Sequence, residues 1–118
     1  MFTSARNQFL GTITSIKQDS LHAEVVLQLK GNDQMVAMIT TSSVKRLGLK
    51  EGREAYALIK APQIILMPAA VGLEVSARNC LCGKVIHVTS GPVTAEVTLE
   101  LPGGNTLKAT VTQDAVLD

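Results

Sequence analysis

One short motif brings together two side chains that could do chemistry, and it occurs twice. Residues 4–7 read SARN, and the same four letters return at residues 76–79, an offset of 72. Serine hydroxyls and arginine guanidinium groups both donate hydrogen bonds. A lone arginine would ordinarily be a solvated surface residue, but the repetition favours a functional role for Arg6 and Arg78.

The other reactive side chains do not form a catalytic or metal-binding set. Cys80 and Cys82 are too close for an ordinary disulfide and too few for a zinc site, so we expect two reduced, small apolar residues. The two histidines do not occupy equivalent positions in the repeat. Glu24 and Glu96 are equivalent, but an enzymatic role would need a partner that the sequence does not show, and a structural hydrogen bond is expected instead. These residues predict a protein that is not an enzyme and holds no metal ion or cofactor.

Composition excludes several classes of protein. The chain has 118 residues, a formal net charge of +1, 46% hydrophobic residues and three aromatic residues. Low charge with high hydrophobicity argues against disorder. A nucleic-acid partner would call for a basic excess and aromatic platforms. No apolar run reaches the roughly 20 residues of a membrane helix, and residues 1–10 lack the apolar core of a secretory signal. We expect a cytoplasmic protein with neither a nucleic-acid nor a membrane partner.

The repeat extends well beyond the SARN motif. At the offset of 72, residues 4–46 overlay residues 76–118 without a gap, and 14 of the 43 pairs are identical. This predicts a first module at residues 4–67, a linker at 68–75 and a second module at 76–118 that lacks its C-terminal part. Either the natural chain continues for about another 20 residues, or another chain supplies the missing strand.

Within a module, the apolar residues alternate with a period of two, which is typical of strands. A turn at residues 41–47 is expected to be helical, with Ser42 or Ser43 as its cap. About five short strands per module predict an all-β, OB-like small barrel. The expected strands are residues 11–16, 21–29, 34–40, 54–59 and 63–67, with Pro62 interrupting the last two and hairpin turns at 30–33 and 102–105.

Several separated motifs together resemble a known family. The patterns SARNxxxGxI, AEVxLxL, ITxxSxxxLGLxxG and LIKAPxIIL follow one another in order. They are similar to the molybdate-binding Mop module of the TOBE family, whose tandem copies form small molybdate-binding proteins called molbindins. The resemblance implies an OB-like barrel, molybdate or tungstate bound between modules, and a homotrimer of tandem modules.

The resemblance also implies which residues bind the oxyanion. In the second module Ala115 stands where the first has Ser43, and the lysine-bearing strand is absent, so sites that mix donors from both modules remain open. The implied donors are Ser4, Arg6, Thr40, Ser43, Lys60 and the N–H of Ala61 in the first module, and Ser76, Arg78 and Thr112 in the second.

Each implied donor has a structural alternative. Lys60 could be a strand-edge lysine that discourages aggregation, and Thr40 and Ser43 could cap a helix, which is compatible with an anion at the same helix start. For Asn7 and Asn79, a bond to local backbone is at least as strong an interpretation as ligand contact. The family match favours oxyanion pairing for Lys60.

The expected function is intracellular binding, storage and homeostasis of molybdate or tungstate, without catalysis. The alternative is the molybdate-sensing part of a transcription regulator or of a molybdate-importer ATPase, although these 118 residues contain neither a helix-turn-helix nor a P-loop. An OB-type nucleic-acid binder is a third hypothesis, and scarce aromatics with near-zero charge speak against it.

Overall fold

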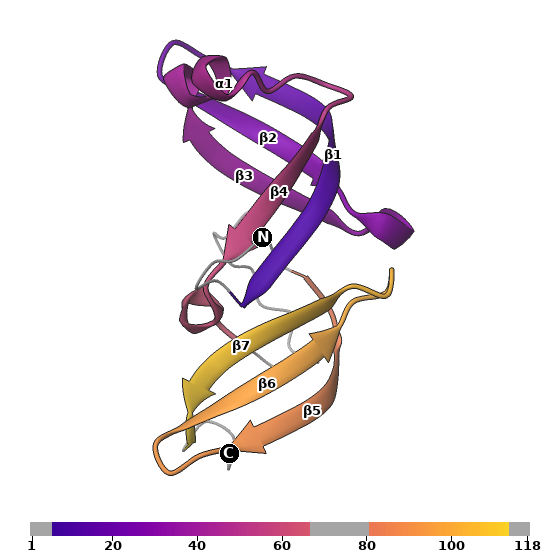
Figure 1. Cartoon of the computed structure of the whole chain (residues 1–118), viewed down its shortest axis with the longest axis vertical. Helices are drawn as coiled ribbons and strands as arrows, with labels where there is room; N and C mark the ends of the chain where they lie inside the picture. Colours follow the sequence, from indigo (N-terminus) through magenta and orange to yellow (C-terminus); the bar gives the residue numbers. More distant parts are fainter. Residues whose placement is uncertain (1–5, 67–80, 114–118) are drawn as a thin grey trace.

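The computed structural model describes residues 6–66 and 81–113, which form two antiparallel sheets arranged along the long axis of the molecule (Figure 1). The predicted all-β, OB-like architecture is confirmed. The predicted linker lies outside the described residues, and so do Ser4, Ser76, Arg78, Asn79, Cys80 and Ala115. No helix of the described residues is long and apolar enough to cross a membrane. In chain order the elements are β1 (Asn7–Gln18), β2 (His22–Gln28), η1 (Lys30–Asn32), β3 (Gln34–Thr40), α1 (Thr41–Leu47), β4 (Glu54–Ile59), η2 (Ala61–Gln63), β5 (Lys84–Ser90), β6 (Thr94–Glu100) and β7 (Thr106–Thr112).

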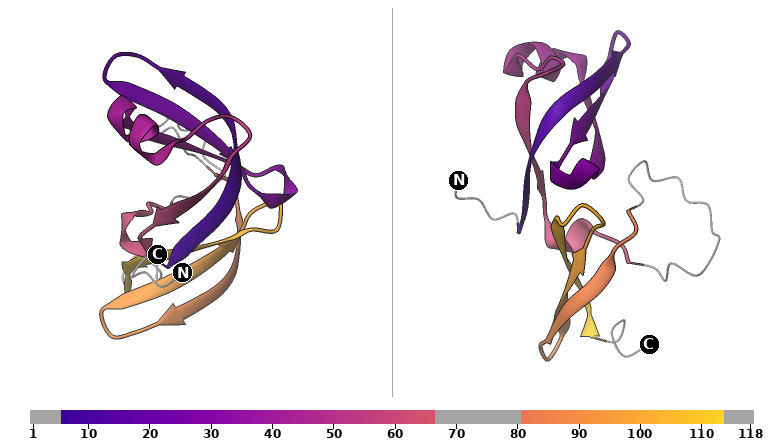
Figure 2. Two further views of the ribbon diagram at one scale, coloured as in Figure 1. Left: turned by 45° about the horizontal axis from the view of Figure 1, so that its top comes forward. Right: turned by 90° about the vertical axis from the view of Figure 1, so that its right-hand side faces the viewer.

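The first sheet has the strand order β3-β2-β1-β4 and coils into part of a barrel (Figure 2). Its centre is β1, which pairs with β4 along its first half and with β2 along its second half. This double pairing makes β1 longer than the predicted strand at residues 11–16. Gly11 lets the side chains of Leu27 and Leu29 pack closely against the backbone of β1, because a Cβ at this position would lie 3.0 Å from both of them.

The predicted helical turn is confirmed, and of the residues that could cap it Thr40 does so, not Ser42 or Ser43. The N-cap of α1 is Thr40, whose side-chain oxygen accepts a hydrogen bond from the N–H of Ser43. Thr40 has the extended backbone that an N-cap requires, while Ser42 and Ser43 already lie inside the helix. The helix ends at Gly48, which adopts the left-handed conformation common at helix C-termini.

The second sheet has the order β5-β6-β7 and reproduces β1, β2 and β3 of the first. Described residues therefore form four strands in the first module, where five had been expected, and three in the second, which was predicted to lack its C-terminal part. The prediction of a strand at residues 63–67 is wrong for its described part. Lys60 is followed instead by the 3-10 turn η2, which carries Pro62 and turns the chain away from β4.

The two modules share a hydrophobic core. Phe9, Leu29 and Met35 of the first module pack with Leu107 of β7, and all four are buried. Ile64, which follows η2, packs against the same cluster. A second cluster, formed by Ile13, Val25 and Leu27, lies wholly within the first module. The first barrel is thus closed at one end by a strand of the second module.

The hairpin turns of the two modules also contact each other. The carboxylate of Asp33 accepts hydrogen bonds from the N–H of Gly103 at 3.0 Å and from the side-chain amide of Asn105 at 2.7 Å. Asp33 and Asn105 are equivalent positions of the repeat. Gly31 meets Gly103 so closely that a Cβ would lie 2.2 Å from its carbonyl oxygen, and its φ is +70°. Only glycine fits at this crossing.

Candidate functional site

Three hydroxyl groups gather where β3 runs into α1. The Thr40 hydroxyl lies 2.8 Å from Ser43 Oγ and 3.2 Å from Ser42 Oγ, and it accepts the Ser43 N–H at 3.1 Å. Two of the three predicted hydroxyl donors of the first module, Thr40 and Ser43, are therefore in contact, and the third, Ser4, lies outside the described residues. The cluster faces solvent, and hydroxyl hydrogens rotate to suit their partners. It can present oriented O–H donors to an incoming acceptor.

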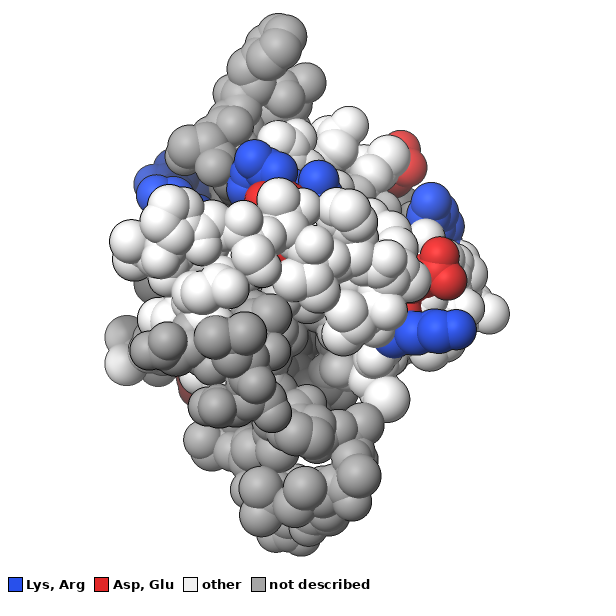
Figure 3. Space-filling view, turned by 90° about the horizontal axis from the view of Figure 1, so that it is seen from below, with Lys and Arg blue, Asp and Glu red and all other residues white. Residues whose placement is uncertain are grey.

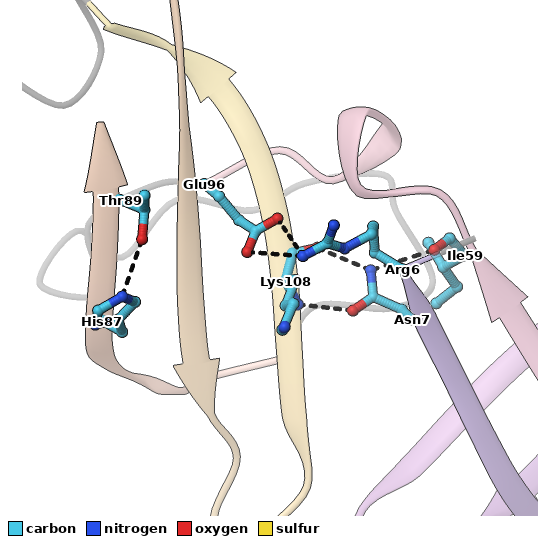
Figure 4. A network of polar contacts seen from close by, with 7 residues as sticks. All are labelled: Arg6, Asn7, Ile59, His87, Thr89, Glu96 and Lys108. Carbon is cyan, nitrogen blue, oxygen red and sulfur yellow. Dashed lines mark hydrogen bonds and ion pairs between the residues drawn. The ribbon is translucent and has the colours of Figure 1, made fainter. Parts of the chain in front are cut away.

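Asn7, at the start of β1, connects the two modules through its side chain (Figure 4). Its amide nitrogen donates to the carbonyl of Ile59 at 3.2 Å and to that of Lys108 at 2.8 Å, and its oxygen accepts the Lys108 N–H at 2.7 Å. The residue is only 2% exposed. Asn7 therefore has a structural role, but it binds distant backbone in place of the local backbone that was expected. One bond joins the first residue of β1 to β4, and two fix it on β7.

Arg6 reaches across to the second module. One guanidinium nitrogen, Nη2, lies 2.8 Å from Oε2 of Glu96 and donates to Oε1 at 3.1 Å (Figure 4). Side-chain exposures are 55% for Arg6 and 30% for Glu96, so water reaches both groups. Sequence reasoning expected a structural hydrogen bond from Glu96 but gave no reason to place it against Arg6.

Lys60 and Ala61 lie at the turn between β4 and η2. Lys60 is exposed and precedes η2, while Ala61 is 1% exposed. The turn η2 packs against β7, as Figure 1 shows. Because Asn7 pairs with Ile59 at the end of the β1–β4 ladder, Arg6 and Lys60 both lie next to this pair. The two cations of the predicted site thus come from one end of the first sheet.

The predicted donors form two separate groups within one chain. Arg6, Lys60 and Ala61 lie at the end of the first sheet that faces the second module, whereas Thr40 and Ser43 lie at the opposite end, beside α1 (Figure 1). The twelve residues of β1 span up to about 36 Å when straight. An ion a few ångströms wide cannot contact both groups of the same chain.

Thr112, the donor expected in the second module, ends β7 and pairs with Thr94 of β6. It occupies the position equivalent to Thr40 in the repeat. The other expected donors of this module, Ser76 and Arg78, lie outside the described residues. The structure therefore locates one of the three.

Charge is thinly spread over the face seen in Figure 3. Described residues there are mostly uncharged, with lysine, arginine and acidic side chains toward the margins. Among the described residues, no three His, Cys, Asp or Glu side chains group as metal ligands would. Exposed Cys82 has a free thiol. On this face, the charged side chains of the described residues are therefore scattered among uncharged ones.

Sequence reasoning missed the contacts that place these groups. Asp33 and Asn105 join the hairpin turns, and Leu107 completes the core of the first module. The repeat held a signal for the first pair, since residues 33 and 105 occupy equivalent positions in the two hairpin turns. Nothing in the alternating pattern indicated that Leu107 belongs to the other module's core.

Comparisons with known proteins find a matching domain family and relatives named for molybdenum transport or binding. The TOBE domain profile matches residues 3–66 and again residues 75–118. The chain is 40% identical over 115 residues to the molybdenum transport protein ModE of Azotobacter vinelandii, covering 98% of this chain and 42% of that protein. It is 37% identical over 113 residues to the molybdenum-pterin-binding protein MopB of Rhodobacter capsulatus, covering 96% and 42%. The chain thus spans about two fifths of the length of these relatives.

Solved structures agree with the sequence comparisons. The cytoplasmic molybdate-binding protein ModG, solved with molybdate bound, superposes with a TM-score of 0.92 at 43% identity, covering 99% of this chain and 83% of that one. MopII from Clostridium pasteurianum superposes with a TM-score of 0.54 at 36% identity, covering 57% of this chain and all of that one. The shorter coverage fits a protein about as long as one module.

Proposed function

The chain belongs to the TOBE-domain family as a tandem pair of Mop-type modules, and we propose that it binds molybdate without changing it chemically. One observation carries this proposal. Over 99% of its length the chain shares 43% identity and a TM-score of 0.92 with ModG, a protein solved with molybdate bound. The proposed modules are residues 4–67 and 76–118, joined by a linker at 68–75.

The chemistry of the donors supports this ligand. Molybdate is a tetrahedral dianion that offers only acceptor oxygens, so a site for it needs O–H and N–H donors and one or two cations. The first module provides the hydroxyls of Thr40 and Ser43, already in mutual contact, and the cations of Arg6 and Lys60. The buried backbone at Ala61 is the proposed N–H donor. We expect the size of the assembled site to favour molybdate over the smaller sulfate.

The separation of the donors supports a site built from more than one chain. Thr40 and Ser43 lie at one end of the first sheet, and Arg6 and Lys60 at the other. A second copy could bring its cations to the hydroxyl cluster of the first. We therefore place the ligand between copies of the chain, in a homotrimer of tandem modules. Ser4, Ser76, Arg78 and Thr112 are the further proposed donors.

The proposed role is intracellular storage and homeostasis of molybdate, with tungstate as an equivalent ligand and no cofactor. Similarity to a cytoplasmic molybdate-binding protein supports this assignment. A second candidate is the molybdate-sensing part of a regulator. It is favoured by 43% identity over 111 residues to the DNA-binding transcriptional dual regulator ModE of Escherichia coli, of which the chain covers 42%.

Isothermal titration calorimetry with molybdate, tungstate and sulfate tests the proposal. Molybdate and tungstate should bind with saturable heats and sulfate much more weakly. Equal, weak heats for all three anions would refute oxyanion binding of this kind. Solution mass with and without molybdate tests the trimer, and a monomer in both states would contradict a site between chains.

Lys60→Ala tests the contribution of the proposed cation. A hydrogen bond to a charged group contributes about 1.5–3 kcal/mol, so the affinity for molybdate should fall by a factor of about 10 to 100. Lys17→Ala is the matched control, because Lys17 is an exposed lysine on β1 that is not among the proposed donors. Equal affinities of the two variants would remove Lys60 from the site.

A further inference from the structure

The cation that the SARN motif supplies is already engaged by a carboxylate of the same chain. Both carboxylate oxygens of Glu96 face one nitrogen of Arg6, at 2.8 and 3.1 Å (Figure 4). Glu96 lies on β6 of the second module, whereas Arg6 precedes β1 of the first. The pair therefore forms only when the two modules are docked on each other.

We propose that Glu96 is an internal competitor for the oxyanion: its carboxylate holds Arg6 in the unliganded protein and weakens the affinity for the dianion. This inference rests on the proposed function, because it assigns Arg6 to the oxyanion site. Glu96 would act on the ligand through Arg6 and not by touching it.

The backbone next to Arg6 is fixed, and this makes the contact specific. Asn7, the next residue, is held to Lys108 by two hydrogen bonds of 2.7 and 2.8 Å. Thr98, the partner of Lys108 in the β6–β7 ladder, lies two residues from Glu96 on the same face of β6. The Arg6 side chain thus starts from a fixed point beside β7 and reaches over that strand to Glu96. The partner of Arg6 is set by the docking of the modules.

The exposure of the pair makes it replaceable. Ion pairs that are open to water are typically weak. Arg6 is 55% exposed and Glu96 30% exposed, so their attraction is screened. A dianion that offers several acceptor oxygens competes effectively for the same guanidinium, which carries five N–H donors. Glu96 would then lower the affinity without blocking the site.

The repeat carries the same pair of residue types in exchanged positions. The offset of 72 maps Arg6 onto Arg78 and Glu24 onto Glu96. Each module therefore contains one arginine and one glutamate at equivalent positions. Both glutamates occur in the identical segment AEV of the two modules. The first module thus carries a glutamate, Glu24, at the position equivalent to Glu96.

Glu96→Gln tests the inference, because glutamine has nearly the same shape but no charge. We expect molybdate to bind about fivefold more tightly, which corresponds to about 1 kcal/mol at about 1.4 kcal/mol per factor of ten. Glu100→Gln is the matched control, since Glu100 lies four residues along the same strand, on the same face, and the change in net charge is identical. Its affinity should stay within twofold of the unsubstituted protein.

A double-mutant cycle separates competition from a structural effect. With Arg6→Gln already present, Glu96→Gln should no longer change the affinity, because the two residues act as a pair. Unchanged or weaker binding by Glu96→Gln in the native background would overturn the inference while leaving the proposed function intact. If the unsubstituted protein and the variant both fail to bind molybdate, the proposed function fails, and the inference fails with it.

Discussion

Replacing Asn7 by aspartate exchanges one side-chain NH₂ group for an oxygen at the junction of the modules and should strongly destabilise the fold. The side-chain nitrogen of Asn7 donates to the carbonyls of Ile59 and Lys108, at 3.2 and 2.8 Å. In Asn7→Asp, an oxygen replaces that nitrogen and faces two carbonyl oxygens. The bond from the Lys108 N–H is retained, because the other oxygen remains an acceptor.

The expected loss follows from burial. Asn7 is 2% exposed, so the two carbonyls cannot turn to water once their donor is gone. Each buried group left unsatisfied costs about 1–3 kcal/mol, and a charged group costs more. We expect Asn7→Asp to lower the free energy of unfolding by about 3–5 kcal/mol. Since small proteins are stable by about 5–15 kcal/mol, this is a large share of the total.

Urea unfolding followed by circular dichroism measures this loss, with Asn32→Asp as the matched control. Asn32 lies on the exposed turn η1, where its side-chain oxygen accepts a bond that aspartate can also accept, so its effect should stay within about 0.5 kcal/mol. Burial raises the pKa of the introduced carboxyl in the folded state above its unfolded value. The deficit of Asn7→Asp should therefore be smallest below about pH 4 and grow as pH rises. Equal unfolding curves for the two variants would refute the clamp.

Two further predictions test the shared core and the turn before β2. Leu107→Ala should lower the free energy of unfolding by about 2–4 kcal/mol, because Leu107 is 8% exposed and packs in the core of the other module. Leu10→Ala is the control and should cost less than about 1 kcal/mol, because Leu10 is 48% exposed. Equal losses of the two variants in urea unfolding would contradict a shared core. Hydrogen bonds from the N–H groups of His22 and Leu21 lower the pKa of Asp19. At pH values above its usual pKa this carboxylate therefore stabilises the fold, and the stabilisation is lost as the pH falls through the lowered pKa. An NMR titration that finds an ordinary pKa for Asp19 would contradict this.

The sequence predicted most local elements because they depend on local rules. Alternating residues gave β2 and β3 to within a residue or two, and Gly31 marked the turn between them by its freedom to adopt a positive φ. Errors arose where pairing partners decide. β1 begins at Asn7 because β4 pairs with it there, and the chain turns into η2 after Lys60 because Pro62 cannot continue a ladder.

The candidate site was only partly predictable, for a related reason. Motifs identify which groups can donate, and Thr40 and Ser43 do lie in contact. Sequence motifs do not indicate how far apart two of them lie in the folded protein. Lys60 follows β4 and Thr40 ends β3, two edge strands of the same sheet, and their distance depends on which ends of those strands they occupy. That information lies in the register of the sheet.

The junction between the modules also explains why the second module matters to the first module's donors. Arg6 is one residue from Asn7, whose position is set by Lys108 of β7. Lys60 precedes η2, which packs on the same strand. The two proposed cationic donors of the first module, Arg6 and Lys60, are therefore positioned by contacts with the second. Even without a lysine-bearing strand among its described residues, the second module serves the proposed site, because β7 supplies the surface on which those cations are placed.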